Sequence, residues 1–137
     1  MATELPQGYR PSDEEPFMNE RQREYFRRKL VAWKEDILRE SRETIQNLQS
    51  EPTPNADLAD RATTEAERQL ELRTRDRERK LLKKISQSLA RIEAGDYGFC
   101  DETGEPIGLG RLIARPTATL SLEAQQRREL KQKMFGD

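Results

Sequence analysis

Two long stretches of this chain repeat apolar residues at helical spacing, and the short link between them contains two prolines. A proline lacks an amide donor and restricts the residue before it, so one continuous helix cannot pass through Pro52 and Pro54. The chain must therefore turn in the link. From residue 51 to residue 60 the charged residues are Glu51, Asp57 and Asp60, so this part of the turn is acidic.

The first stretch predicts a helix from about residue 20 to residue 50. Asn19 and Gln22, three residues apart at its start, have the spacing of a capping box. At about 1.5 Å per residue this helix is about 45 Å long. Its seam residues recur at steps of three, four and seven, which is a heptad pattern. They are Phe26, Leu30, Trp33, Ile37, Thr44 and Leu48.

The second stretch predicts a helix that begins at Asp57 or Asp60 and ends at Ala94, where Gly95 supplies the stop. Its apolar seam is strong toward the C-terminal end and weak in the middle, where basic residues dominate. Two helices of similar length joined by a short link are expected to lie antiparallel. The seam residues are Ala62, Ala66, Leu70, Leu81, Ile85, Leu89 and Ile92.

These patterns predict a mainly α protein with three parts. Prolines, a glycine and three consecutive acids indicate a flexible leader at 1–18. A coiled-coil hairpin is expected at 19–94, with its tip at 51–62. Four glycines and a proline between 95 and 108 predict tight turns, so residues 95–137 are expected to form a small knuckle and a final helix. That helix is expected to begin with Ser121 as its N-cap.

The composition excludes several classes of protein. With 37% charged and 33% hydrophobic residues, the 137-residue chain suits long helices with a narrow apolar seam. A formal net charge of −1 gives no global attraction to nucleic acid or to an anionic membrane, so neither sequence-specific nucleic-acid binding nor a membrane partner is expected. The N-terminus lacks the basic start and apolar run of a signal peptide, which predicts a cytoplasmic location.

The chain has one cysteine, Cys100, and no histidine. These counts remove an intramolecular disulfide and most zinc sites, which need three or four Cys or His ligands. They also remove catalysis by a Cys-His pair or by a Ser-His-Asp triad. We therefore expect no enzymatic activity and no bound metal.

Basic side chains recur at helical spacing in the middle of the second helix. The plainer interpretation is a solvated face with intrahelical ion pairs to Asp76 and Glu78. The alternative is a binding surface, because seven bases and two acids leave an excess of five positive charges that suits an acidic channel wall or a phosphate ligand. The stripe consists of Arg73, Arg77, Lys80 and Lys84, flanked by Arg75, Arg79 and Lys83.

Four stretches together carry a resemblance to a known family. They are Met18-Asn19-Glu20 with Phe26-Arg27-Arg28, Asp60-Arg61-Ala62, the basic run from Leu72 to Ile85, and Gly98-Phe99-Cys100 with the segment from Leu112 to Ala118. From about Met18 to Phe135 the chain resembles the DksA family of bacterial transcription factors. The resemblance implies a monomeric regulator whose hairpin enters the secondary channel of RNA polymerase. It also implies action with guanosine tetraphosphate (ppGpp) in the stringent response, where ribosomal RNA promoters are inhibited.

The resemblance gives the acidic tip a role. Asp57, Asp60 and Ala62 match the family's tip, which lies near the catalytic centre of the polymerase. Carboxylates delivered there can perturb the coordination of Mg²⁺, which prefers oxygen ligands. The plainer interpretation is helix capping by the two aspartates, which contributes roughly 1 kcal/mol. Both roles can coexist.

The resemblance also implies polymerase contacts and a nucleotide site. Leu81, Lys84 and Arg115 match the family's ppGpp site, and a lysine with an arginine suits a tetraphosphate. Gln125 replaces a further lysine of that site. The plainer interpretation of Arg115 is a packing side chain ahead of Pro116. The residues expected to contact the polymerase are Arg73, Arg77, Lys80 and Lys83.

The resemblance fails at the zinc finger. Where the family has four cysteines, the matching residues are Cys100, Thr103, Ser121 and Ala124. One thiolate cannot replace four ligands that contribute on the order of 10 kcal/mol, so the chain resembles a zinc-independent branch. Cys100 is then a half-buried remnant or, alternatively, a redox-sensing thiol, although its acidic neighbours should raise its pKa. We expect the knuckle to be held by packing of Phe99, Ile107, Leu109, Leu112, Leu120 and Leu122.

Two other functions fit the rod. A Gre-type factor also carries two tip acids and stimulates transcript cleavage, but its C-terminal domain is a larger, sheet-rich fold that a short knuckle does not provide. A purely structural coiled coil needs neither the tip acids nor the basic stripe. Substitution of the tip aspartates separates regulation from a structural role.

Overall fold

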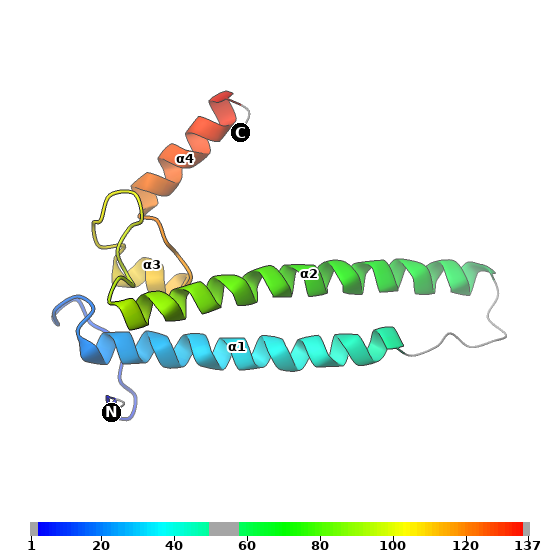
Figure 1. The fold of residues 1–137 in the computed structure, drawn as a ribbon, viewed down its shortest axis with the longest axis horizontal. Helices are drawn as coiled ribbons and strands as arrows, with labels where there is room; N and C mark the ends of the chain where they lie inside the picture. The colour runs from blue at the N-terminus through cyan, green and yellow to red at the C-terminus, as the bar shows by residue number, and fades with distance from the viewer. Residues whose placement is uncertain (1–2, 50–57, 136–137) are drawn as a thin grey trace. The chain divides into compact units, whose positions relative to one another are not determined.

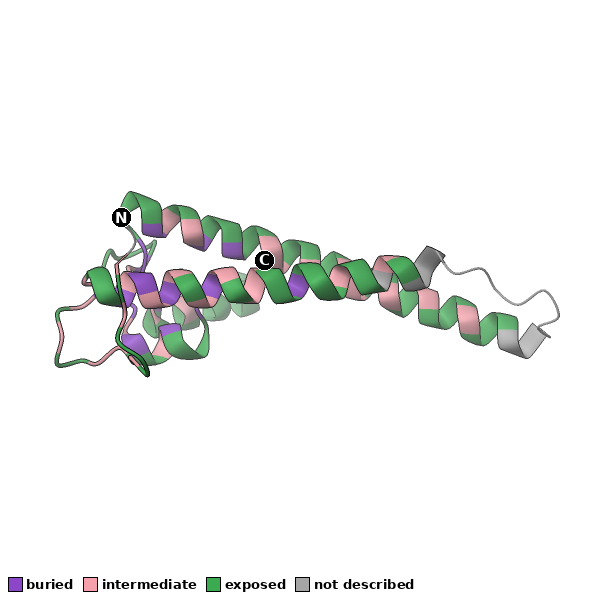
Figure 2. Ribbon diagram, turned by 90° about the horizontal axis from the view of Figure 1, so that it is seen from below, coloured by how far each residue is buried: buried purple, intermediate pink, exposed green. Residues whose placement is uncertain are grey.

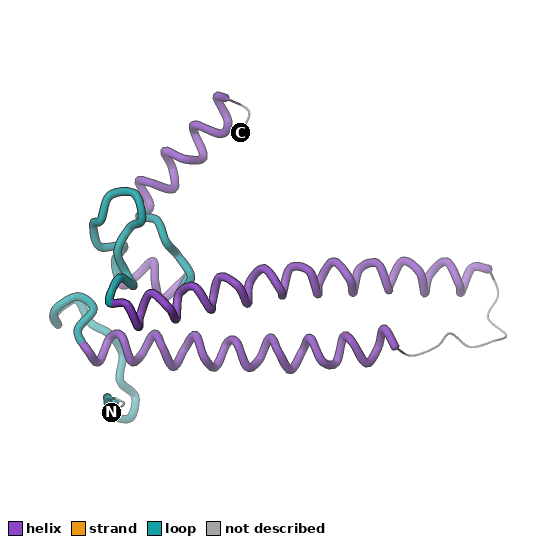
Figure 3. Tube along the Cα trace, viewed as in Figure 1, coloured by secondary structure: helices purple, strands orange, loops and turns teal. Residues whose placement is uncertain are grey.

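The computed structural model describes residues 3–49 and 58–135, apart from the side chains of residues 44, 47–49 and 58–60. Its elements are α1 (Glu20–Gln49), α2 (Leu58–Ala94), α3 (Leu109–Ala114) and α4 (Leu122–Phe135). Within these described ranges the elements are helices joined by loops, without a strand (Figure 3). The predicted mainly α class is therefore confirmed.

The two long helices, α1 and α2, lie side by side and antiparallel as the predicted hairpin (Figure 1). The chain divides into two compact units. We call Met1–Val31 with Ser86–Asp137 the core unit, and Ala32–Ile85 the hairpin unit. Each long helix contributes to both units, and the two units are described separately below.

The first turn of α1 is fixed by an extended form of the predicted capping box. The side-chain oxygen of Asn19 accepts a hydrogen bond from the Gln22 backbone N–H at 2.9 Å, as the spacing predicts. The Gln22 side chain reaches one residue further back than expected, because its Oε1 accepts from the Met18 N–H at 2.7 Å. Its amide also donates to the Ser12 carbonyl at 3.1 Å. The fully buried Gln22 thus ties the preceding segment to α1.

The residues before α1 make specific contacts in the core unit. The Tyr9 hydroxyl donates to the Glu15 carboxylate at 2.9 Å, and Met18 is buried. The Phe17 and Phe99 rings meet edge to face with centroids 5.5 Å apart. The predicted leader therefore contributes side chains to the core, and its mobility stays a prediction.

The hairpin seam is confirmed along the described side chains of α1 and along the C-terminal part of α2. Buried and exposed residues alternate along the long helices (Figure 2). Phe26 and Leu30 are fully buried in the core unit, and Ile37 and Ile85 are buried in the hairpin unit. Trp33, Leu81 and Leu89 are half-buried, and Ile92 is buried. Thr44 and Leu48 lie outside the described side chains.

The seam prediction is wrong at the beginning of α2. Ala62 and Ala66 are exposed, and Leu70 is 60% exposed. Alanine buries too little apolar area to fix a helix face. In addition, α2 has 37 residues against 30 in α1, so its first turns extend past the last residue of α1 (Figure 1).

The knuckle of the core unit is built on a small apolar cluster. Ile107, Leu109, Leu112 and Leu120 are buried, as predicted, and Phe99 is half-buried. Two of these residues, Leu109 and Leu112, lie on the short helix α3, which was not predicted from the sequence. The Tyr97 hydroxyl adds a buried hydrogen bond, donated to the Pro116 carbonyl at 2.7 Å.

The start of α4 is confirmed in one respect and corrected in another. The Ser121 hydroxyl accepts a hydrogen bond from the Ala124 N–H at 3.2 Å, so Ser121 is the predicted N-cap. The prediction that Leu122 packs into the knuckle is wrong, because Leu122 is 57% exposed. Ala124, two residues further on, faces the knuckle and is fully buried instead.

Candidate functional site

The predicted tip lies largely outside the described residues. Asp57 is outside them, and Asp60 belongs to α2 but its side chain is not described. Ala62 is described and exposed. Because neither aspartate side chain is described, the capping role and the functional role of Asp57 and Asp60 both stay predictions.

The basic stripe lies on an uninterrupted part of α2 within the hairpin unit. Arg73, Arg77, Lys80 and Lys83 are all exposed. Among the described residues of this stretch, the recorded ion pair joins Arg79 and Asp76 at 3.7 Å, with both side chains about two-thirds exposed or more. The interpretation as a solvated face with ion pairs thus accounts for Arg79, one of the bases that flank the stripe. The polymerase-binding role of Arg73, Arg77, Lys80 and Lys83 stays a prediction, and their exposure is compatible with it.

Two residues of the predicted nucleotide site stand on the same part of α2. Leu81 is half-buried and Lys84 is exposed, and residues three positions apart are neighbours on a helix surface. Arg115 belongs to the core unit, so the three residues as one site stay a prediction. Gln125, which replaces a further lysine in the family comparison, donates to the Glu129 carboxylate at 2.9 Å.

Arg115 is presented at the end of α3. Its backbone N–H donates to the Arg111 carbonyl at 2.7 Å, which closes the last helical turn. Arg115 itself is exposed, whereas Pro116 after it is buried. The exposure of Arg115 disfavours the interpretation as a packing side chain and favours an outward-facing phosphate ligand.

The four positions that correspond to zinc ligands do not form a metal site. Cys100 is 3% exposed, Ala124 has no donor atom, and the Ser121 hydroxyl is used as a helix cap. Thr103 is exposed. In the described part of the chain, no three Cys, His, Asp or Glu side chains gather where a metal ion could be held. One thiol with two hydroxyls does not match the thiolate and imidazole set of a structural zinc ion.

The Cys100 thiol differs from the sequence expectation. Burial raises its pKa, but hydrogen bonds from the Thr103 hydroxyl and from the backbone N–H groups of Ser121, Thr103 and Glu102 outweigh burial and lower the pKa to about 6. The expectation that the carboxylates of Asp101 and Glu102 raise this pKa is wrong. The Thr103 hydroxyl makes the largest of these lowering contributions, and the backbone N–H groups of Ser121, Thr103 and Glu102 add to it.

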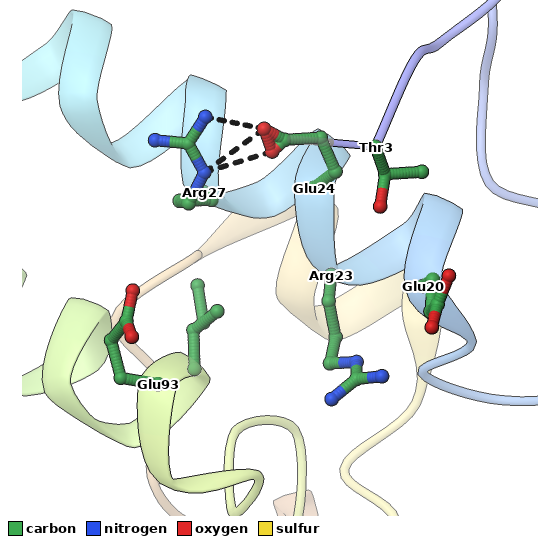
Figure 4. Close-up of a pocket in the computed structure, with 7 residues that line it drawn as sticks. Thr3, Glu20, Arg23, Glu24, Arg27 and Glu93 are labelled. Atoms are coloured by element: carbon green, nitrogen blue, oxygen red, sulfur yellow. Dashed lines mark hydrogen bonds and ion pairs between the residues drawn. The ribbon is translucent and has the colours of Figure 1, made fainter. Parts of the chain in front are cut away.

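A hollow of about 500 Å³ in the core unit was not anticipated from the sequence (Figure 4). On one wall Glu24 accepts hydrogen bonds from Arg27 Nε at 2.8 and 3.0 Å, which lowers the pKa of the Glu24 carboxyl. Arg23 Nε is buried and has no hydrogen-bond partner among the described residues. Three carboxylates and two guanidiniums line the hollow, so it has no excess positive charge for an anion.

Comparison with known proteins identifies the family. Residues 22–92 match the family model described as DnaK suppressor protein DksA, N-terminal domain. Residues 95–130 match the model of the prokaryotic dksA/traR C4-type zinc finger. The chain belongs to the DksA family. The two DksA matches cover the hairpin and the knuckle, so the resemblance found in the sequence is confirmed over both parts.

Individual relatives agree with this assignment. The RNA polymerase-binding transcription factor DksA of Caulobacter vibrioides is 65% identical over 129 residues, which are 94% of this chain and 91% of the relative. The factor of the same name from Escherichia coli is 43% identical and covers 94% of this chain and 87% of its own length. The solved structure of transcription factor DksA2 from Pseudomonas aeruginosa has a TM-score of 0.77 at 43% identity, covering 85% of this chain and 90% of that one.

None of the described helices combines the length and the apolar character that a bilayer crossing requires. The long helices α1 and α2 are instead rich in charged residues on their outer faces.

Proposed function

We propose that this protein regulates transcription initiation by binding RNA polymerase through its secondary channel, with the hairpin tip close to the catalytic centre. The proposal includes action together with ppGpp, a monomeric state and a cytoplasmic location. The protein has no catalytic activity of its own in this scheme. It destabilises promoter complexes, above all at ribosomal RNA promoters.

The observation that carries the proposal is 65% identity, over 94% of the chain, to a protein named for binding RNA polymerase. The antiparallel pair α1 and α2 supports it, because entry into a channel by a hairpin tip requires two long helices joined at one end. The exposed bases Arg73, Arg77, Lys80 and Lys83 suit an acidic channel wall. A rod with a purely structural role has no need for an exposed face with this excess of bases.

The tip is tested with Asp57→Asn and Asp60→Asn in one variant. Neutral amides of the same shape keep a helix cap but remove the charge that acts on a catalytic metal. In a purified transcription system we expect inhibition of a ribosomal RNA promoter to be lost, while affinity for polymerase changes by less than about 2-fold. Glu65→Gln, an exposed acid on α2, is the matched control. Unchanged inhibition by the double variant contradicts the proposed tip mechanism and favours a structural rod.

The nucleotide site is tested with Lys84→Ala and Arg115→Ala. Each substitution removes a cation that suits a phosphate group, so the response to ppGpp should fall by about 10-fold or more in each. Arg42→Ala, an exposed arginine on α1, is the control and should keep the full response. A full response in both variants refutes the assignment of Leu81, Lys84 and Arg115 as the nucleotide site.

Transcript cleavage separates the proposal from the Gre-type alternative. If the protein is a regulator without catalytic support, stalled polymerase complexes should cleave their transcripts at the same rate with and without it. A rate increase that depends on Asp57 and Asp60 would favour the alternative. A separate measurement, metal analysis of the purified protein, tests the prediction that no metal is bound. Stoichiometric zinc would contradict that prediction.

A further inference from the structure

The knuckle belongs to a C4-type zinc-finger family, yet its residues do not fit zinc. In a finger of this type the metal joins two separate chain segments, which here contain Cys100 and Ser121. The knuckle is nevertheless compact, with Tyr97, Cys100 and Leu120 buried. Some other group must therefore make the connections that a metal ion makes elsewhere in the family.

Arg91, in the last turn of α2, makes the densest set of contacts to the first segment. Its guanidinium forms an ion pair with the Asp101 carboxylate. The same group donates to the Phe99 carbonyl at 2.8 Å and to the Asp96 carbonyl at 3.3 Å. The Arg91 carbonyl also accepts from the backbone N–H groups of Asp96 at 2.9 Å and Tyr97 at 3.2 Å. Arg91 thus contacts Asp96, Tyr97 and Phe99, which precede Cys100, and Asp101, which follows it.

The contacts continue from this turn to the second segment. The Asp101 N–H donates to the Thr119 carbonyl at 2.8 Å, just ahead of Ser121. From α4, the Arg128 guanidinium forms an ion pair with Glu102 at 2.9 Å. The segment around Cys100 is therefore linked to α2 on one side and to the start of α4 on the other, which are the connections a metal would provide.

We propose that the Arg91 guanidinium takes the place of the metal as the positioning group of the knuckle. A guanidinium has five N–H donors in a fixed plane and can serve several acceptors at once, which a lysine ammonium cannot do with the same geometry. The Arg91 side chain is only 22% exposed, so its ion pair with Asp101 is shielded from solvent more than a typical surface pair. The Arg128–Glu102 pair is a second link, and its guanidinium is the more exposed of the two at 53%.

Hydrogen exchange of the backbone amides tests the proposal in the protein alone. Arg91→Ala should lower the protection of the Cys100, Asp101 and Gly104 amides by about 10-fold or more, because their local opening then breaks fewer contacts. Protection in the hairpin unit should stay unchanged. Arg91→Lys should recover little of the loss. The control is Arg79→Ala, which removes an exposed α2 guanidinium with a single, weak partner. Unchanged protection in Arg91→Ala overturns the proposal.

A second variant, at the residue that pairs with Arg91, keeps the proposal testable if Arg91→Ala unfolds globally. Asp101→Asn removes only the charge that faces the guanidinium and leaves the carbonyl contacts in place. It should loosen the same amides by a smaller factor than Arg91→Ala. In the double variant the two effects should not add, because they remove the same interaction. Fully additive effects would show that Arg91 and Asp101 act separately, and the proposal would fail.

Restoring a metal site gives the most selective test. In Arg91→Ala, the added substitutions Thr103→Cys, Ser121→Cys and Ala124→Cys complete a four-cysteine set with Cys100. If Arg91 substitutes for the metal, zinc should return the protection that Arg91→Ala loses, and a chelator should remove it again. A general loss of stability does not predict this zinc-specific rescue. If zinc binds but the amide protection does not recover, the proposal that Arg91 takes the place of the metal is refuted.

A functional consequence rests on the proposed function. The knuckle carries Arg115, so Arg91→Ala should weaken the ppGpp response while tip-dependent inhibition without ppGpp is retained. Hydrogen exchange needs neither polymerase nor nucleotide, so the two ideas fail separately. If the unaltered protein does not respond to ppGpp at all, the proposed function is contradicted. The role of Arg91 in positioning the knuckle is then still tested by hydrogen exchange.

Discussion

The core unit and the hairpin unit use similar amounts of charge in different ways. In the core unit charged groups are tied to defined partners, as in the pairs of Glu24 with Arg27 and Arg91 with Asp101. In the hairpin unit the recorded pairs, Arg39 with Asp36 and Arg79 with Asp76, are exposed on both sides. The same residue types thus fix a fold in one unit and cover a surface in the other.

Buried apolar side chains are divided just as unequally. Of the thirteen buried hydrophobic residues recorded among the described side chains, Ile37 and Ile85 belong to the hairpin unit and the rest to the core unit. Burial of apolar area is the main favourable term in folding. We infer that the core unit supplies most of the stability and that the hairpin unit is free to carry residues chosen for a partner.

The largest expected effect comes from the centre of the core unit. Phe26 is fully buried, with its ring 5.2 Å from that of Tyr25 and 5.6 Å from that of Tyr97. Phe26→Ala should lower the free energy of unfolding by about 3–5 kcal/mol, measured by urea denaturation. Leu70→Ala in the hairpin unit, where the side chain is exposed, should change it by no more than about 0.5 kcal/mol. Equal losses of unfolding free energy in the two variants would contradict the inference that the core unit supplies most of the stability.

The next effect depends on pH and concerns Cys100. Folding lowers the thiol pKa from 9.0 to about 6, so the folded state favours the thiolate. This contribution to stability is complete above pH 9, declines as the pH falls and is absent below about pH 6. Cys100→Ala should therefore lose stability on the order of a few kcal/mol more at pH 9 than at pH 6, by urea denaturation at both values. A loss that is the same at both pH values contradicts a thiolate in the folded state.

The sequence predicted what depends on periodicity and on spacing within a few residues. Heptad steps located Phe26, Leu30 and Ile85, and the positions of Asn19 and Ser121 located two helix starts. Such features depend on the residue types and on the fixed geometry of a helix, both of which can be read from the chain. They account for the hairpin and for most of the knuckle core.

The sequence did not predict what depends on backbone direction or on contacts between distant segments. The lowered Cys100 pKa follows from the Thr103 hydroxyl and from backbone N–H groups that converge on the sulfur, including that of Ser121, twenty-one residues away in the chain. Arg91 was not singled out from the sequence, because its acceptors are mainly carbonyl groups and carbonyls have no sequence signature. Lys84 and Arg115 entered the candidate site through family resemblance alone.

A third prediction concerns the tight contact between the segment before α1 and the knuckle. Gly98 has a φ of +93°, and an added Cβ would lie 2.8 Å from Met18 Cγ and 3.3 Å from the Phe17 ring. Gly98→Ala should therefore cost about 1–3 kcal/mol of unfolding free energy by urea denaturation. Gly104→Ala, with a φ of +73° and open space around it, should cost only about 1 kcal/mol. If both variants lose the same amount, the Met18 contact is not a tight part of the core unit.

The smallest effect is expected for an ion pair of the hairpin unit. Asp36 and Arg39 are 59% and 62% exposed, so solvent screens their attraction and ordering two mobile side chains offsets part of it. Asp36→Asn should change the free energy of unfolding by about 0.5 kcal/mol or less, with no further difference when salt is added. A loss above about 1 kcal/mol would mean that the hairpin unit has a cooperative polar network of its own. Its charges would then be constrained by folding, and the exposed basic stripe would no longer indicate selection for a partner.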